Sequence, residues 1–190
     1  MADYFVAGDE ILENKLGIVD PDDFKVAEQE IVTSKSADVL SEAPKAFGPG
    51  YLLHIHKVLF DDIYDFAGKI RTVDIAKPDA SAPFAYVQFL EAESKRIFEE
   101  LANKSYFKGL DARTFIQEIT NLAAQLNALH PFREGNGRVI RLFLIMLADN
   151  AGYLLDYSQV SADELISADK LAFEGEIKSL HSVYIRVVGT

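Results

Sequence analysis

Apolar residues recur at helical spacing over residues 115–129, and this run ends just before a proline. The apolar positions lie three or four residues apart: Phe115, Ile119, Leu122, Leu126 and Leu129. This spacing predicts an amphipathic helix, with Asp111 as its N-cap. The helix should end at His130, because the residue before a proline, here Pro131, is pushed out of the helical region. His130 therefore marks a helix boundary that faces a loop.

Weaker helical patterns occur along the rest of the chain, and they predict a mainly α fold. They cover residues 22–35, 50–66, 86–103, 137–150 and 161–187. A glycine ends many helices, so we expect Gly152 to stop the helix over 137–150. The chain has 190 residues with no internal repeat and no low-complexity linker. We therefore expect a single domain over residues 1–190.

One segment, residues 69–86, breaks the helical pattern. Its β-branched residues come first: Ile70, Thr72, Val73 and Ile75. A turn-forming stretch of Lys, Pro, Asp, Ala and Ser follows at residues 77–81. This order is typical of a short β-hairpin. One small β element is therefore expected beside the helices.

Composition excludes several classes of protein. The sequence contains no cysteine, which rules out a disulfide framework, a thiolate zinc site and a catalytic thiol, and which fits a reducing compartment. The first ten residues carry acidic groups and lack an apolar core of signal-peptide length. The longest apolar run, Leu142–Ala148, is far shorter than the roughly 20 residues that a membrane span needs. We expect a cytoplasmic protein without a membrane partner.

The formal net charge is −11 at pH 7, which argues against nucleic acid as a partner. Binding along a phosphate backbone needs many clustered lysines and arginines. A compact site can still be positive inside an acidic protein. Three neighbouring arginines could hold one small anion: Arg133, Arg138 and Arg141.

The stretch between the two apolar runs concentrates groups that can bind phosphate. Gly135 and Gly137 flank Asn136 just before a new helix. Consecutive N–H groups can then point into one concavity, and the helix N-terminus adds partial positive charge. Arg138 and Arg141 lie three residues apart, so they share a face and could reach the same ligand. A chain of phosphates would fit this geometry.

The same stretch supplies a carboxylate and a histidine. Glu134 would be badly placed as a direct phosphate contact, whereas it suits a Mg²⁺ ion that bridges two phosphates, because Mg²⁺ commonly takes one or two carboxylates and phosphate oxygens. His130 can act as a general base, since its ordinary pKa lies near neutrality. Phe132 is interpreted as an apolar anchor that fixes the loop between them.

Each of these residues also has an ordinary explanation when it is taken alone. A single histidine at a helix end more often caps the helix or packs in the core, glycines usually make turns, and arginines on a helix surface are usually solvated. The remaining histidines have no comparable neighbours and are interpreted as structural or surface residues: His54, His56 and His181.

Taken together, residues 130–141, HPFREGNGRVIR, match the signature His-x-Phe-x-(Asp or Glu)-Gly-Asn-Gly-Arg-x-x-Arg of the Fic (filamentation induced by cAMP) family at every specified position. Residues 59–75 also resemble the family's helix that leads into its flap, and residues 147–157 resemble the segment after the catalytic helix. Residues 12–18 resemble the start of short stand-alone bacterial members. The resemblance implies a compact helical Fic fold with a small β-hairpin flap at about residues 71–83. The motif loop and its helix would occupy residues 130–150.

The activity implied by this resemblance is transfer of AMP from ATP to a Ser, Thr or Tyr hydroxyl of a target protein. By the same resemblance, His130 would deprotonate the hydroxyl, Glu134 would hold Mg²⁺, and Phe132 would anchor the motif. The nucleotide phosphates would be bound by the remaining motif residues: Gly135, Asn136, Gly137, Arg138 and Arg141.

The flap would align the backbone of the target by strand addition. The residues expected to do this are Thr72, Val73, Asp74 and Ile75. An ordinary surface hairpin is the alternative interpretation of the same residues.

Rival functions differ in the group that is transferred or in whether any reaction takes place. Protein kinases of the Doc type are Fic relatives that transfer the γ-phosphate, and they generally carry Lys where this chain has Gly137. Other relatives transfer a different nucleotide or phosphocholine. A catalytically silent Fic fold could act as an interaction module, although such degeneration normally removes a motif residue.

Control of the activity is the last question that the family pattern raises. Many Fic proteins carry an inhibitory helix with the pattern (Ser or Thr)-x-x-x-Glu-(Gly or Asn), whose glutamate pairs with the second motif arginine. Glu precedes Gly or Asn at Glu13, Glu134 and Glu174, but no Ser or Thr lies four residues before any of them. We therefore expect a toxin restrained by a separate small antitoxin-like protein. Self-inhibition through Glu13, preceded by Asp9, is the alternative.

Overall fold

The computed structural model describes residues 11–44, 46–76 and 83–189. Within them lie seven α-helices: α1 (Pro21–Leu40), α2 (Pro49–Phe60), α3 (Leu90–Asn103), α4 (Ala112–Leu129), α5 (Asn136–Ala151), α6 (Ala162–Phe173) and α7 (Lys178–Val187). Short 3₁₀ turns occupy Val87–Phe89, Ser105–Phe107 and Tyr157–Gln159. The prediction of a mainly α fold is confirmed.

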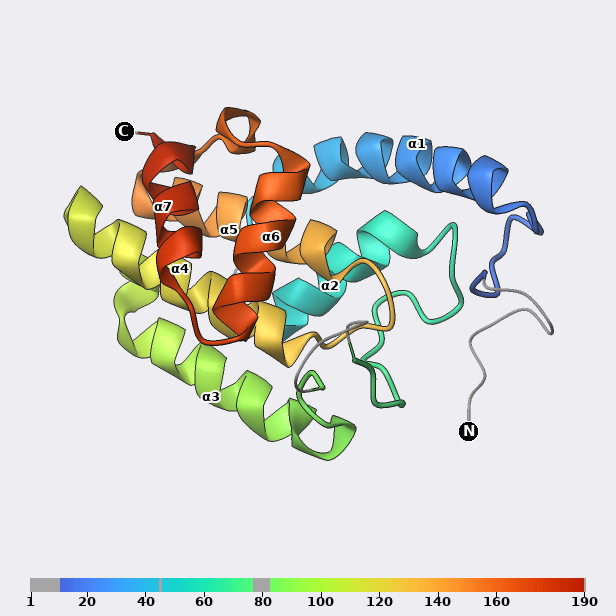
Figure 1. Ribbon diagram of the computed structural model, residues 1–190, viewed down its shortest axis with the longest axis horizontal. Helices are drawn as coiled ribbons and strands as arrows, with labels where there is room; N and C mark the ends of the chain where they lie inside the picture. Colours follow the sequence, from blue (N-terminus) through green and yellow to red (C-terminus); the bar gives the residue numbers. More distant parts are fainter. Residues whose placement is uncertain (1–10, 45, 77–82, 190) are drawn as a thin grey trace.

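Helix α5 forms the centre of the molecule, and other helices surround it (Figure 1). It packs against α1, α2 and α4, and its end adjoins strand β1 (Leu154–Leu155). Its inward side chains are fully buried: Val139, Phe143, Leu144, Leu147 and Ala148. The polar motif at the start of α5 is therefore attached to a helix that packs in the close-packed core.

The expected caps of α4 and α5 are present. The Asp111 carboxylate accepts hydrogen bonds from the amides of Arg113 and Thr114, each at 3.1 Å. Gly152 ends α5 with a φ of 88°, a left-handed conformation that glycine adopts without steric cost. Both ends were predictable because a single residue type supplies each cap.

Two of the weaker helical patterns end differently from the prediction. Residues 161–187 form two helices, α6 and α7, because Gly175 between them has a φ of 96° and cannot continue a right-handed helix. The pattern over 50–66 gives a helix only as far as Phe60. The chain then turns, which buries Ile63 and Tyr64.

The small β element lies away from the predicted hairpin. Strand β1 pairs antiparallel with β2 (Val188–Gly189), so that Leu155 lies opposite Val188. The turn of the predicted hairpin, residues 77–82, falls outside the described residues. Its described arms, residues 71–76 and 83–86, contain no strand, although the Phe84 amide donates to the Ile75 carbonyl at 3.3 Å.

Among the described helices, none combines the length and the hydrophobicity that crossing a membrane requires.

Candidate functional site

His130 ends α4 in a left-handed conformation, with φ 45° and ψ 60°. The predicted helix boundary is confirmed, but the residue before Pro131 adopts a backbone that few non-glycine residues use. Such a conformation costs on the order of 1–3 kcal/mol and persists only where neighbours enforce it. Here the His130 amide still donates to the Leu126 carbonyl at 3.1 Å, and the His130 carbonyl accepts from Arg71 at 2.8 Å.

The imidazole of His130 is fixed in plane and in tautomer. Its ring stacks on Phe84 with 3.7 Å between centroids and 13° between planes. Its Nδ1 lies 3.2 Å from the Asn127 carbonyl oxygen. Because a carbonyl only accepts, Nδ1 must carry the proton, and Nε2 is then the basic nitrogen of the neutral ring. This is the tautomer that a general base at Nε2 requires.

Phe132 and Asn136 close the loop between α4 and α5. Phe132 is fully buried and stacks on His56 at 3.9 Å, as expected of an anchor. The Asn136 side chain accepts from the Phe132 amide at 2.9 Å and donates to the Phe132 carbonyl at 2.8 Å. The polar atoms of the Asn136 side chain therefore bond to the loop itself, and its main-chain amide is the group left for a ligand.

Position 135 requires glycine for two reasons: its backbone has a positive φ, and the ring of Phe60 leaves no room for a side chain. Its φ is 77°, and a Cβ at this position would lie 2.3 Å from Cζ of Phe60. Behind it, the amides of Asn136, Gly137 and Arg138 begin α5 and have no acceptor among the described residues. Three unpaired amides at the start of this 16-residue helix give a positively polarised end that could hold an anion.

Arg141 lies beside these amides. Its Nη1 is 3.3 Å from the position that a Cβ on Gly137 would occupy, so the guanidinium rests against the glycine. Within residues 11–44, 46–76 and 83–189, no carboxylate forms an ion pair with it. Arg141 is therefore available to an anionic ligand at the same helix end.

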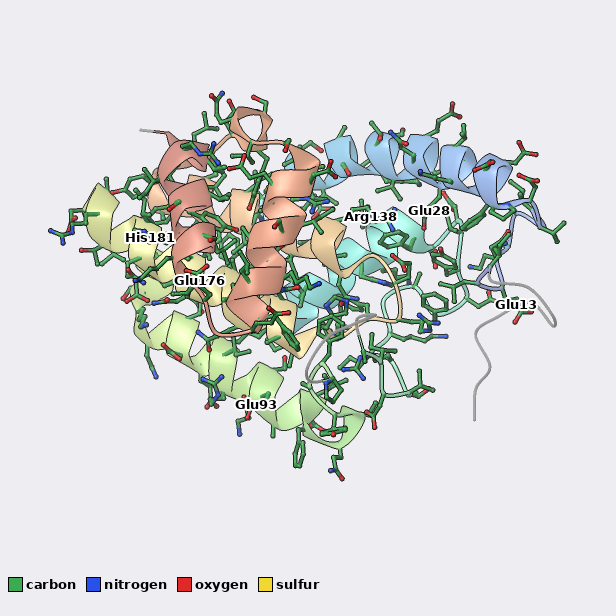
Figure 2. All side chains as sticks on the ribbon, in the orientation of Figure 1. Glu13, Glu28, Glu93, Arg138, Glu176 and His181 are labelled. Carbon is green, nitrogen blue, oxygen red and sulfur yellow. The ribbon has the colours of Figure 1, made fainter. Side chains whose placement is uncertain are left out.

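Arg138 is held by two carboxylates. Its Nη1 donates to Oε2 of Glu28 at 2.9 Å, and its Nη2 lies 3.3 Å from Oε1 of Glu134. Figure 2 shows Glu28 on α1 facing Arg138 at the start of α5. Glu28 is 110 residues distant in sequence and belongs to no motif, so sequence reasoning missed it.

His56 contacts the loop between α4 and α5 through Phe132 and Glu134. Its Nδ1 accepts from the Gly68 amide at 2.8 Å, which leaves Nε2–H to donate to the Glu134 carbonyl at 3.2 Å. Burial, helped by nearby Arg138, lowers the pKa of His56 to about 4, against the hydrogen bond to Glu134. The structural interpretation of His56 is confirmed. Its ring and its hydrogen bond position Phe132 and Glu134 of the motif. His54 is at the surface, paired with Glu42 at 3.0 Å.

Arg71 joins the flap to the end of α4. Its guanidinium is buried, with Nε donating to the His130 carbonyl at 2.8 Å and Nη1 to the Val73 carbonyl at 2.7 Å. Nη2 donates to the Ala85 carbonyl. These bonds hold the described part of the flap, including Thr72 and Ile75, beside the loop of His130. No sequence pattern marked Arg71, because arginine is rarely a core residue.

The residues present fit a Mg²⁺ ion that arrives with a nucleotide. The Glu134 side chain is 45% exposed at the loop. The described residues contain no group of three or more His, Cys, Asp or Glu that could hold a metal alone. One accessible carboxylate beside an anion site is what Mg²⁺ needs when phosphate oxygens complete its shell.

Comparison with known proteins shows which family this helical fold and motif belong to. The sequence model of the Fic/DOC family matches residues 46–148. The chain therefore belongs to the Fic/DOC family.

Two curated relatives and one solved structure place the chain within that family. It is 36% identical, over 93% of its length, to the protein adenylyltransferase VbhT of Bartonella schoenbuchensis, of which it spans 36%. It is 30% identical, over 97% of its length, to the probable protein adenylyltransferase Fic of Escherichia coli, of which it spans 91%. The crystal structure of the effector BepC from Bartonella tribocorum, with bound AMPPNP, superposes with a TM-score of 0.95 at 26% identity, covering 98% of this chain and 96% of that one.

Proposed function

We propose that the chain is a protein adenylyltransferase, which transfers AMP from ATP to a hydroxyl side chain of a target protein. One observation carries this proposal: His130, with Nδ1 held by the Asn127 carbonyl, stands at one end of a short loop whose other end is the unpaired N-terminus of α5. A base and a phosphate site thus share one loop. The names of the two curated relatives support the same chemistry.

The reaction follows from the roles of these groups. Nε2 of His130 takes the proton of the target hydroxyl, and the hydroxyl oxygen forms a bond to the α-phosphorus of ATP. The bond between that phosphorus and the oxygen bridging to the β-phosphate breaks, and pyrophosphate leaves. The α5 amides and Arg141 would stabilise the negative charge that develops on the leaving group. Mg²⁺, held by Glu134 and the phosphates, would supply further charge neutralisation.

Labelled ATP tests the proposal directly. Label from the α-phosphate should remain on a target protein after denaturing electrophoresis, whereas label from the γ-phosphate should not. Retention of the γ-label would show phosphorylation instead, and retention of neither label in a lysate of the source cell would leave a binding role. Gly137 disfavours phosphorylation, because kinases of the Doc type generally carry Lys at this position.

We further propose that a separate small protein restrains this activity by presenting a carboxylate to Arg141. Within the described residues, Arg141 has no ion-pair partner. Glu13, the internal candidate, is exposed and lies well apart from Arg138 and the start of α5 (Figure 2). The variant Glu13→Gly should therefore transfer AMP at the rate of the wild type without any partner present. A large rise in the variant would instead assign the inhibition to Glu13.

A further inference from the structure

Glu28 lies outside residues 46–148, the part of the chain that matches the family model. It nevertheless contacts the motif. We propose that Glu28 is a positioning residue that draws Arg138 away from Glu134, so that Glu134 keeps the negative charge that a divalent cation needs. This inference rests on the proposed nucleotide chemistry and adds to it a residue of α1.

The two carboxylates do not share Arg138 equally. Glu28 receives both terminal nitrogens, with distances of 2.9 and 3.4 Å, whereas Glu134 receives one at 3.3 Å. The Glu28 side chain is 14% exposed and that of Glu134 is 45% exposed. A bidentate pair shielded from water is stronger than a single contact open to it. Arg138 is therefore bound mainly to Glu28.

Two further contacts fix this arrangement. The Tyr64 hydroxyl donates to Oε1 of Glu28 at 2.8 Å. Burial, reinforced by the charge of Glu28, raises the pKa of Tyr64, so the hydroxyl stays a donor throughout the physiological range. The ring of Phe60 lies under the guanidinium, with 4.8 Å from Cζ of Arg138 to its centroid. Tyr64 therefore orients Glu28, and Phe60 packs against Arg138, so both members of the ion pair are fixed by a further contact.

Glu28 changes the net charge beside Glu134. One guanidinium between two carboxylates leaves one net negative charge at the edge of the loop. Without Glu28, the pair of Arg138 and Glu134 would be neutral, and the two side chains would bind each other more tightly. A divalent cation is attracted to the first arrangement and loses that attraction in the second. A polyphosphate without its cation has the opposite preference.

The test compares two variants of α1 that remove one charge each. Glu28→Gln removes the partner of Arg138, whereas Glu30→Gln removes an exposed carboxylate two residues along the same helix. Equilibrium binding of a fluorescent, non-hydrolysable ATP analogue is measured in EDTA and across a Mg²⁺ titration. Relative to Glu30→Gln, Glu28→Gln should raise the half-saturating Mg²⁺ concentration on the order of fivefold. In EDTA it should bind the analogue equally well or better.

The contrast between the two conditions separates a positioning role from simple damage to the fold, which would weaken binding in both. Parallel weakening, or a Mg²⁺ dependence equal to that of Glu30→Gln, would overturn the inference. If Glu28→Gln does not fold, Glu28→Asp decides, because its shorter side chain should give an intermediate rise and a wild-type value would contradict it. A wild-type chain that binds no analogue would refute the proposed function, and this inference with it.

Discussion

Nε of Arg71 donates a hydrogen bond to the main-chain oxygen of His130, with 2.8 Å between the two atoms. The same guanidinium also binds the carbonyls of Val73 and Ala85. One buried side chain therefore joins both arms of the flap to the residue proposed as the base. The segment that would align the target and the group that would deprotonate it are parts of one hydrogen-bonded unit.

Replacing Arg71 with Met should destabilise the protein by about 3 kcal/mol, because it leaves three partly buried carbonyl groups without their donor and removes a buried side chain. Urea denaturation measures this change in the free energy of unfolding. Lys69→Met is the matched control, since Lys69 is exposed and its replacement should cost less than about 0.5 kcal/mol. Similar values for the two variants would mean that the carbonyls find other partners.

Replacing His130 with Ala should reduce AMP transfer by about 10²- to 10⁴-fold, the usual contribution of a positioned general base. Nucleotide binding should persist, because the α5 amides and Arg141 do not depend on the imidazole. Transfer of α-label and equilibrium binding of an ATP analogue measure the two properties. His54→Ala, at an exposed histidine, should leave both unchanged. Undiminished transfer in His130→Ala would remove the assignment.

His56 should make stability depend on pH. Its pKa is lowered from 6.5 to about 4 in the folded protein, so the unfolded chain binds its proton at a higher pH than the folded one. The stabilisation is therefore complete above about pH 6.5 and is lost as the pH falls towards 4. Between pH 7 and pH 5 this should amount to about 2 kcal/mol.

Urea denaturation of the wild type and of His56→Gln at both pH values tests this expectation. The difference between pH 7 and pH 5 should be about 2 kcal/mol smaller in the variant, which has no titrating group at this position. An unchanged difference would show that other groups govern the pH dependence.

Gly135→Ala should destabilise the protein more than Gly109→Ala. The two glycines have φ values of 77° and 76°, but only a Cβ at Gly135 would meet a neighbour, the ring of Phe60 at 2.3 Å. Gly109→Ala should cost about 1–2 kcal/mol from backbone strain alone, and Gly135→Ala about 1–3 kcal/mol more from overpacking. Thermal unfolding compares them. Adding Phe60→Leu should recover part of the extra loss, and a failure to do so would exclude the ring as its cause.

A proline at Ile75 should separate target modification from nucleotide binding. The substitution removes one main-chain donor from the flap, so strand addition by a target should weaken. Labelled AMP on the target should fall several-fold, while the affinity for an ATP analogue should stay at the wild-type value. Equal loss of both would indicate that the substitution disturbs the fold instead.

The sequence allowed prediction of those features that depend on neighbours along the chain. Asp111 and Gly152 act within one helical turn, and the motif residues around Asn136 form one continuous stretch. The pairing of Glu28 with Arg138 could not be predicted, because it depends on how α1 lies against α5. Arg71 was missed for a related reason, since its acceptors are main-chain oxygens, which carry no mark in the sequence. Gly175 was passed over as a helix end, because a glycine can lie within a helix as well as end one and only its φ of 96° distinguishes the two.

The two hydrogen bonds between the Asn136 side chain and the main chain of Phe132 tie the two ends of the loop between α4 and α5 together. The loop proposed to bind phosphate is therefore restrained by its own side chain, and part of its conformational entropy is lost when the protein folds rather than when a ligand binds. We expect nucleotide association to need little rearrangement of this loop, so that its rate is set mainly by diffusional encounter and charge. An inhibitor of this site would then act by occupying the site or by neutralising its charge.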